Sequence, residues 1–239
     1  MDETEQPWSR NAILIGGTLI GLYLAALISL GYVGQLHLRY ALEEQEQLSV
    51  EKQAAAIAYF LTDQQETLDG LSRSPQIQTF LANRDLGMSM RYGLRASLLA
   101  VSRALNDARD QQVLHGRRVF RSIVFVENDG NVLVTQGSSD SIDAENAYLG
   151  HAARTPGKVR VEAGREGPTL VFVSAVVFKG AAAGYLAAEI DASAMLRPYL
   201  ELGDGNHSSH RTALVDQQAN VIVAGNTPDW VTQYKLALR

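Results

Sequence analysis

The chain has 239 residues, a formal net charge of −5 and no cysteine. This length suits one or two modest domains. The lack of cysteine excludes disulfides, thiol catalysis and cysteine-ligated metal sites, and an acidic chain without a basic block gives no electrostatic support for nucleic-acid binding.

The first predicted element is a transmembrane helix over residues 11–34, preceded by a tail of residues 1–10. No Asp, Glu, Lys or Arg occurs from Asn11 to Leu38. The apolar stretch at residues 12–33 would extend roughly 33 Å as a helix, which is enough to cross a hydrocarbon core of about 30 Å. A cleaved signal peptide is the alternative, but it has a shorter apolar core and a small-residue cleavage site, whereas GQLHLRY follows here. We therefore expect an uncleaved, single-pass anchor in the inner membrane.

A helical stalk and a second helix are expected over residues 35–110. A stripe in steps of four and three starts at Leu36 and is mainly apolar from Val50 onward, which is heptad spacing. Two interpretations remain open: the helix packs on its own domain, or it forms the stalk of a parallel homodimer. Pro75 should end or kink the helix, and a second helix is expected from about Met88 to Asp110.

Strands dominate the next predicted module, residues 111–202. Val119–Glu127 and Asn131–Thr135 flank NDG, a strong hairpin signal. After a polar segment at about residues 137–157 come three more strands, KVRVEA, TLVFVSAVVF and AGYLAAEID, and then a helix with Asp191 or Ser193 as its cap. The sequence therefore predicts an α+β fold with a five-stranded antiparallel sheet and flanking helices.

Residues 203–239 contain a second copy of the first hairpin. At an offset of 89 positions, Val126 matches Val215, and NVLV from Asn131 matches NVIV from Asn220. Because so short a remainder cannot complete a sheet, we expect a linker and the beginning of a second, truncated module. The alternative is that this hairpin is an appendix to the first sheet.

This order of elements resembles the extracytoplasmic Cache (PAS-like) sensor domains of bacterial receptors. The resemblance rests on FVENDGNVLV, NAYLGHAARTPGKVRV and LVFVSAVVFKGAAAGYLAAEIDASAML, and it covers about residues 35–225. It implies a double-Cache receptor whose sensor region lies outside the cytoplasm. It also implies a parent protein with a histidine kinase, chemoreceptor or cyclic-dinucleotide output domain. The chain itself carries no signature of such an output, so neither enzymatic activity nor a cofactor is expected of it.

The resemblance implies a ligand pocket between the sheet and the segment at residues 137–157. Tyr148 matches the family's first pocket aromatic, but Asn146 and Leu149 stand where amino-acid-binding members carry an Arg and a second aromatic. Classical α-amino-acid binding is therefore not expected. Glu162 lies near the place of that subgroup's ammonium-binding Asp.

Other side chains could complete the ligand site. Guanidinium groups favour carboxylates or phosphates, and strand residues can face either side of a sheet. A solvated surface charge is the alternative for each cation. The further candidates are His151, Arg154, Arg160, Arg121, Ser174 and Tyr185.

Two functions remain open at this stage. The preferred one is a membrane-anchored sensor that binds a small molecule and passes a conformational change through its stalk. An anionic ligand is one option. The other is a membrane-tethered structural protein whose sheet makes protein contacts without a ligand. No metal site is assigned, because His207 and His210 lack a third ligand.

Overall fold

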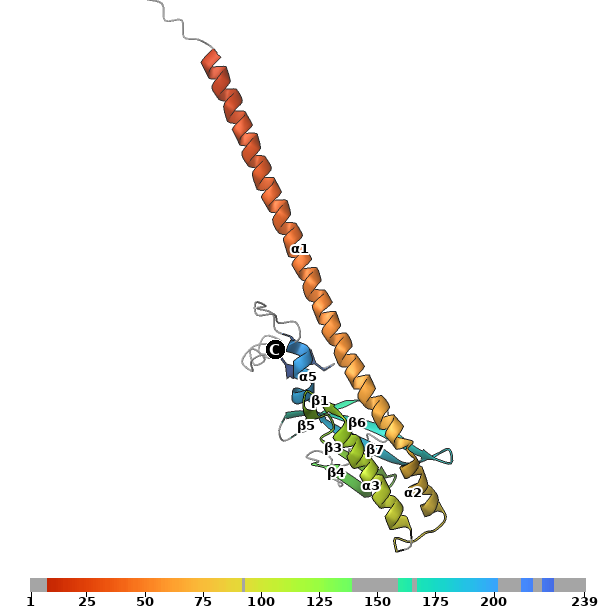
Figure 1. Ribbon diagram of the computed structural model, residues 1–239. Coiled ribbons are helices and arrows are strands. Elements are labelled where there is room, and N and C mark those ends of the chain that lie inside the picture. The colour runs from red at the N-terminus through yellow and green to blue at the C-terminus, as the bar shows by residue number, and fades with distance from the viewer. Residues whose placement is uncertain are drawn as a thin grey trace, which may run out of the picture. The chain divides into compact units, whose positions relative to one another are not determined.

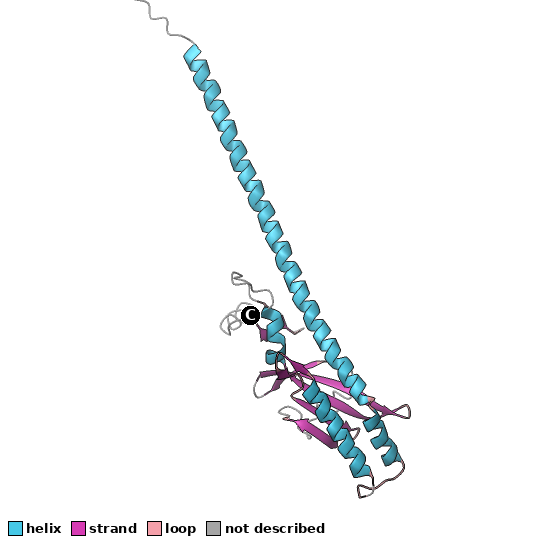
Figure 2. Cartoon of the chain, in the orientation of Figure 1, coloured by secondary structure: helices cyan, strands magenta, loops and turns pink. Residues whose placement is uncertain are grey.

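The computed structural model describes residues 8–91, 93–138, 159–164, 167–201, 212–216 and 221–225 (Figure 1). The chain divides into two compact units, Met1–Lys52 and Gln53–Arg239. Among the described residues, the chain begins with three helices, and the strands follow the third helix (Figure 2). This arrangement confirms the α+β class.

Helix α1, Trp8–Ser72, includes the predicted membrane segment and the predicted stalk. Its apolar segment exposes large side chains such as Leu22 and Ile28. By length and composition, α1 is the described helix that could cross a membrane. A helix with apolar side chains on every face suits a lipid environment, because it has no polar face for water.

Pro75 ends the first helix as predicted. Helix α1 stops at Ser72, and α2, Pro75–Asp85, starts with the proline in its first turn, where a missing N–H costs nothing. The predicted start of the next helix at Met88 is wrong. Helix α3, Leu94–Gln111, begins after Gly93, whose φ of 101° interrupts the helix.

The five-stranded antiparallel sheet is confirmed, with the order β4-β3-β7-β6-β5. Helix α5, Ala192–Glu201, follows the last strand, and the Asp191 carboxylate caps it by accepting the Ala194 N–H at 2.9 Å. A short hairpin of β1, Val113–Leu114, and β2, Arg117–Arg118, was not predicted. The sheet strands are β3, Ser122–Glu127; β4, Val132–Gly137; β5, Arg160–Gly164; β6, Gly167–Phe178; and β7, Ala181–Asp191.

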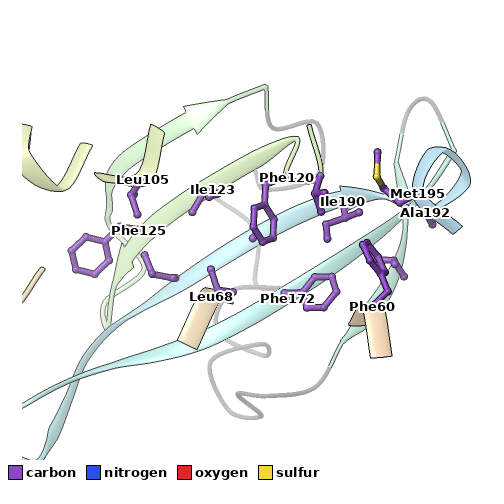
Figure 3. Close-up of a cluster of buried hydrophobic side chains, with 14 of the residues drawn as sticks. Phe60, Leu68, Leu105, Phe120, Ile123, Phe125, Phe172, Ile190, Ala192 and Met195 are labelled. Atoms are coloured by element: carbon purple, nitrogen blue, oxygen red, sulfur yellow. The ribbon is translucent and has the colours of Figure 1, made fainter. Parts of the chain in front are cut away.

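One face of this sheet, the helix face, packs against α1, α2 and α3. Figure 3 shows Phe60 and Leu68 of α1 beside Phe172 of β6, and all three side chains are buried. The C-terminal part of the stalk stripe thus packs on its own domain. The same cluster includes Ile77 and Phe80 of α2, Val101 and Leu105 of α3, and Ile123, Phe125, Leu186, Ala188 and Ile190 of the sheet.

The second hairpin repeats the first in three dimensions. Strands β8, Ala213–Val215, and β9, Val221–Ala224, pair antiparallel as a separate two-stranded sheet. The register shifts between Leu214 and Val215, the positions that match Phe125 and Val126, where the first hairpin shifts its register. The repeat therefore includes a β-bulge, which adds one residue to a strand. The full extent of the second module stays a prediction.

Candidate functional site

The second face of the sheet is apolar in its middle. Side chains of a β-strand alternate between faces, so the residues between those of the helix face form the opposite surface. These side chains are almost fully buried. The cluster comprises Val124, Val126, Val171, Val173 and Ala187.

A polar row crosses one end of this second face. The strand register places Ser122 opposite Glu189, Glu189 opposite Val171, and Val171 opposite Arg160. Glu162 lies two residues further along β5, so it is on the same face as Arg160. We call Ser122, Glu189, Arg160 and Glu162 the charged row.

Glu189 is the most unusual member of the charged row. Its side chain is 0% exposed, and one carboxylate oxygen accepts the Ser122 hydroxyl at 2.9 Å. Removing a carboxylate from water costs several kcal/mol unless charged or hydrogen-bonding groups surround it. The sheet therefore holds a buried carboxyl group next to the apolar middle of this face.

The pKa of Glu162 is affected by the other charges of the row. Burial raises the pKa of its carboxyl above the ordinary value, the Arg160 guanidinium opposes that rise, and the Glu189 carboxylate adds to it. The Glu162 carboxyl therefore lies within electrostatic reach of both Arg160 and Glu189. Together these three side chains carry a net charge of −1.

The structure gathers only some of the predicted site residues on the second face. Arg160 and Glu162 lie in the charged row, and Tyr185 packs at the other end of the face beside the valine cluster. Four residues separate Tyr185 from Glu189 along β7, or about 13 Å. Tyr148, His151 and Arg154 lie outside the described residues, as do His207 and His210.

Ser174 and Arg121 are not part of this surface. The Ser174 hydroxyl donates to the Ser72 hydroxyl of α1 at 3.1 Å, which places it on the helix face. Arg121 immediately precedes β3, and its side chain lines a separate pocket beside the end of α3.

Sequence reasoning missed Ser122 and Glu189. The available signal was the charge in YLAAEID, a strand whose other residues are mostly apolar. A charged residue at a strand position with buried neighbours marks either a sheet edge or a functional face. Placing Glu189 and Arg160 in the same row also requires the order of the strands in the sheet, which the sequence does not show.

Two solved sensor domains have a similar fold. The sensor domain of the V. cholerae histidine kinase DctB matches with a TM-score of 0.55 and 12% identity, covering 82% of this chain and 76% of that one. The periplasmic domain of Vibrio cholerae LuxQ matches with a TM-score of 0.51 and 17% identity, covering 75% of this chain and 81% of that one. No family model and no curated protein matches the sequence. These matches show that the chain has the fold of solved sensor domains, as the resemblance in the sequence implies.

Proposed function

We propose, from the Cache fold and the charged row, that this chain is the extracytoplasmic ligand-sensing region of a membrane receptor. The observation that carries the proposal is the fully buried Glu189 carboxylate, which acts on Glu162 on a sheet face that is apolar in its middle. Mostly apolar surfaces with a few convergent polar groups are typical of small-molecule sites.

The charges favour a ligand with an amine. Glu162 and Glu189 outnumber Arg160, and a raised carboxyl pKa returns toward its ordinary value when a cation approaches. The arginines of the sequence suggested an anionic ligand as one option, but the described charges of this face favour a cationic group. Arg160 would then orient an oxygen-bearing part of the same molecule.

Signal transmission follows from the two faces of the same strands. The Gln65 side-chain amide of α1 donates to the Val173 carbonyl at 3.3 Å, while the Val173 side chain belongs to the second face. A ligand that moves β6 would therefore change the packing of α1. It needs only a few kcal/mol of differential affinity for the two packings to shift their populations.

Thermal unfolding of the full chain in detergent, measured with panels of amines and carboxylates, tests this function. An amine at 100 times its Kd should add about 2.7 kcal/mol to the free energy of unfolding. Its affinity should fall as the pH is lowered through the raised pKa of Glu162, because a protonated carboxyl no longer attracts a cation. If no compound in either panel raises the midpoint, the structural alternative is favoured.

A further inference from the structure

Four arginines line a pocket that is separate from the charged row. The pocket has a volume of about 370 Å³ and lies where α3 ends and α5 begins. Its lining includes the side chains of Arg109, Arg117, Arg118 and Arg121, together with Asp191 and Ala194. This volume is within the range of small-molecule sites.

The short β1–β2 hairpin brings these arginines together. His115 and Gly116 both have positive φ, 51° and 74°, which is the requirement of a tight type I′ turn. The returning strand is joined to the end of α3 by a hydrogen bond from the Val119 N–H to the Gln112 carbonyl at 2.9 Å. Arg117 and Arg118 thereby come close to Arg109, which lies in the last turn of α3.

Arg109 is held in a narrow space beside the end of β4. Its side chain is 14% exposed, and a Cβ atom built on Gly137 would lie 2.7 Å from its Nη1. Among the described residues, its buried Nε has no hydrogen-bond acceptor. A buried donor without an acceptor is costly, and more so on a charged group, so an acceptor supplied by a ligand would lower that cost.

Positive charge exceeds negative charge around the pocket. Asp110 pairs with Arg109 at 3.3 Å and with Arg118 at 3.0 Å, and Asp191 caps α5. Among the described residues, four guanidinium groups and one carboxylate, that of Asp191, are in the lining, and Asp110 lies beside it. The Arg117 side chain makes no hydrogen bond or ion pair within the described part of the chain.

We propose that this pocket binds a phosphate group, either free or in a small ester. Guanidinium groups donate paired N–H bonds that match phosphate oxygens, and a phosphate oxygen could supply the acceptor that the buried Arg109 Nε lacks among the described residues. The arginines come from α3, from the hairpin and from the start of β3, so they approach from several directions. A tetrahedral group accepts hydrogen bonds from several directions, whereas a carboxylate accepts them in one plane.

Calorimetric titration of the full chain in maltoside detergent, at ionic strength held constant with chloride, tests this site. The probes are inorganic phosphate and glycerol 3-phosphate. Saturable binding of inorganic phosphate supports a free-anion site, and binding of glycerol 3-phosphate alone supports a site for an ester. Arg117→Gln and Arg118→Gln should each weaken the binding about tenfold, the effect of losing one charge-assisted hydrogen bond.

Two controls keep the test specific. Arg103→Gln removes the same charge from an exposed position of α3 outside the pocket and should leave phosphate affinity unchanged. Glu189→Gln, on the second face, should also leave it unchanged, so that failure here is distinguishable from failure of the proposed sensing function. The proposal is overturned if neither probe binds saturably at millimolar concentrations, or if Arg103→Gln weakens binding as much as Arg117→Gln.

Discussion

At the residue scale, both burial and neighbouring charges act on the Glu162 carboxyl of the second face. Glu189 is fully buried beside Ser122 and next to the apolar middle of that face, and its charge acts on Glu162 across β6. A carboxylate in such a place lowers the stability of the fold unless hydrogen bonds or charges compensate it, and such groups are common at functional sites. The Glu189 side chain therefore accounts both for a loss of folding stability and for the proposed binding of a cationic group on this face.

The raised pKa of Glu162 has a consequence for stability. The folded chain holds this proton more tightly than the unfolded chain does. The free energy of unfolding should therefore fall as pH rises from the ordinary value of 4.5 to the raised pKa, and stay level above it. Glu162→Gln should remove this fall. Arg160→Gln should enlarge it, because the guanidinium opposes the rise in pKa. Thermal unfolding midpoints across this range check the prediction, which fails if all three proteins show one pH profile.

Gly184 of β7 is required by close approach and not by its φ angle. A Cβ atom there would collide with the Val126 carbonyl and lie 3.1 Å from the Phe125 ring. Gly184→Ala should therefore destabilise the fold by about 1–3 kcal/mol.

The same substitution at Gly70 is the matched control. Gly70 lies in α1, and a Cβ atom there would have no atom within 4 Å apart from the backbone of its own helix. Gly70→Ala should therefore stabilise the fold by roughly 0.5–1 kcal/mol. Denaturant titration measures both changes. Equal signs for the two variants would contradict the account of Gly184.

At the element scale, the burial of α1 differs along its length. Its apolar segment is exposed within the chain, whereas its last turns bury Phe60 and Leu68 against the sheet. The Gln53 amide donates to the Leu200 carbonyl at 3.2 Å, and the Thr212 hydroxyl donates to the same carbonyl at 2.9 Å. The end of α5 is thus hydrogen-bonded both to α1 and to the residue that precedes β8.

Packing of the stalk on its own domain can be tested at Leu68. This side chain is 0% exposed, so Leu68→Ala should cost about 2–5 kcal/mol of unfolding free energy. Tyr59 lies on the same helix but is 75% exposed, and Tyr59→Ala should change stability by less than about 0.5 kcal/mol. Denaturant titration of both variants decides the matter. A small effect at Leu68 would mean that the stalk is not part of the domain core.

The sequence was informative where a local rule sets the structure. The NDG turn and its repeat predicted both hairpins, and Pro75 predicted the end of α1, because turn and proline chemistry act within a few residues. The β1–β2 hairpin escaped prediction because two-residue strands carry no alternating pattern. The start of α3 was missed because Gly93 interrupts an otherwise helical sequence.

The candidate site was less predictable than the fold. Strand periodicity separates alternate residues of one strand, but it does not show which side of the sheet faces the helices. Ser174 turned out to contact Ser72 of α1. Glu189 and Arg160 are far apart in the chain, and only the order of β7, β6 and β5 brings them onto one row.

At the scale of the whole molecule, the two faces of one sheet have different surroundings. Its helix face joins the sheet to α1, and its second face carries the charged row. The proposed phosphate pocket lies where α3 ends and α5 begins, and its lining does not include Glu189, Arg160 or Glu162. A ligand on the second face and an anion in the pocket would therefore act on the sheet from different places.

Calorimetric titration of the full chain with the amine that most raises its unfolding midpoint tests the sensing account most directly. Glu127→Gln is the matched control, because Glu127 is also a strand glutamate but pairs with Arg84 away from the charged row. We expect Glu189→Gln to weaken the binding at least about tenfold, the loss of one charge–charge contact, and Glu127→Gln to leave it unchanged. Binding that is equally tight in wild type and Glu189→Gln would contradict the account.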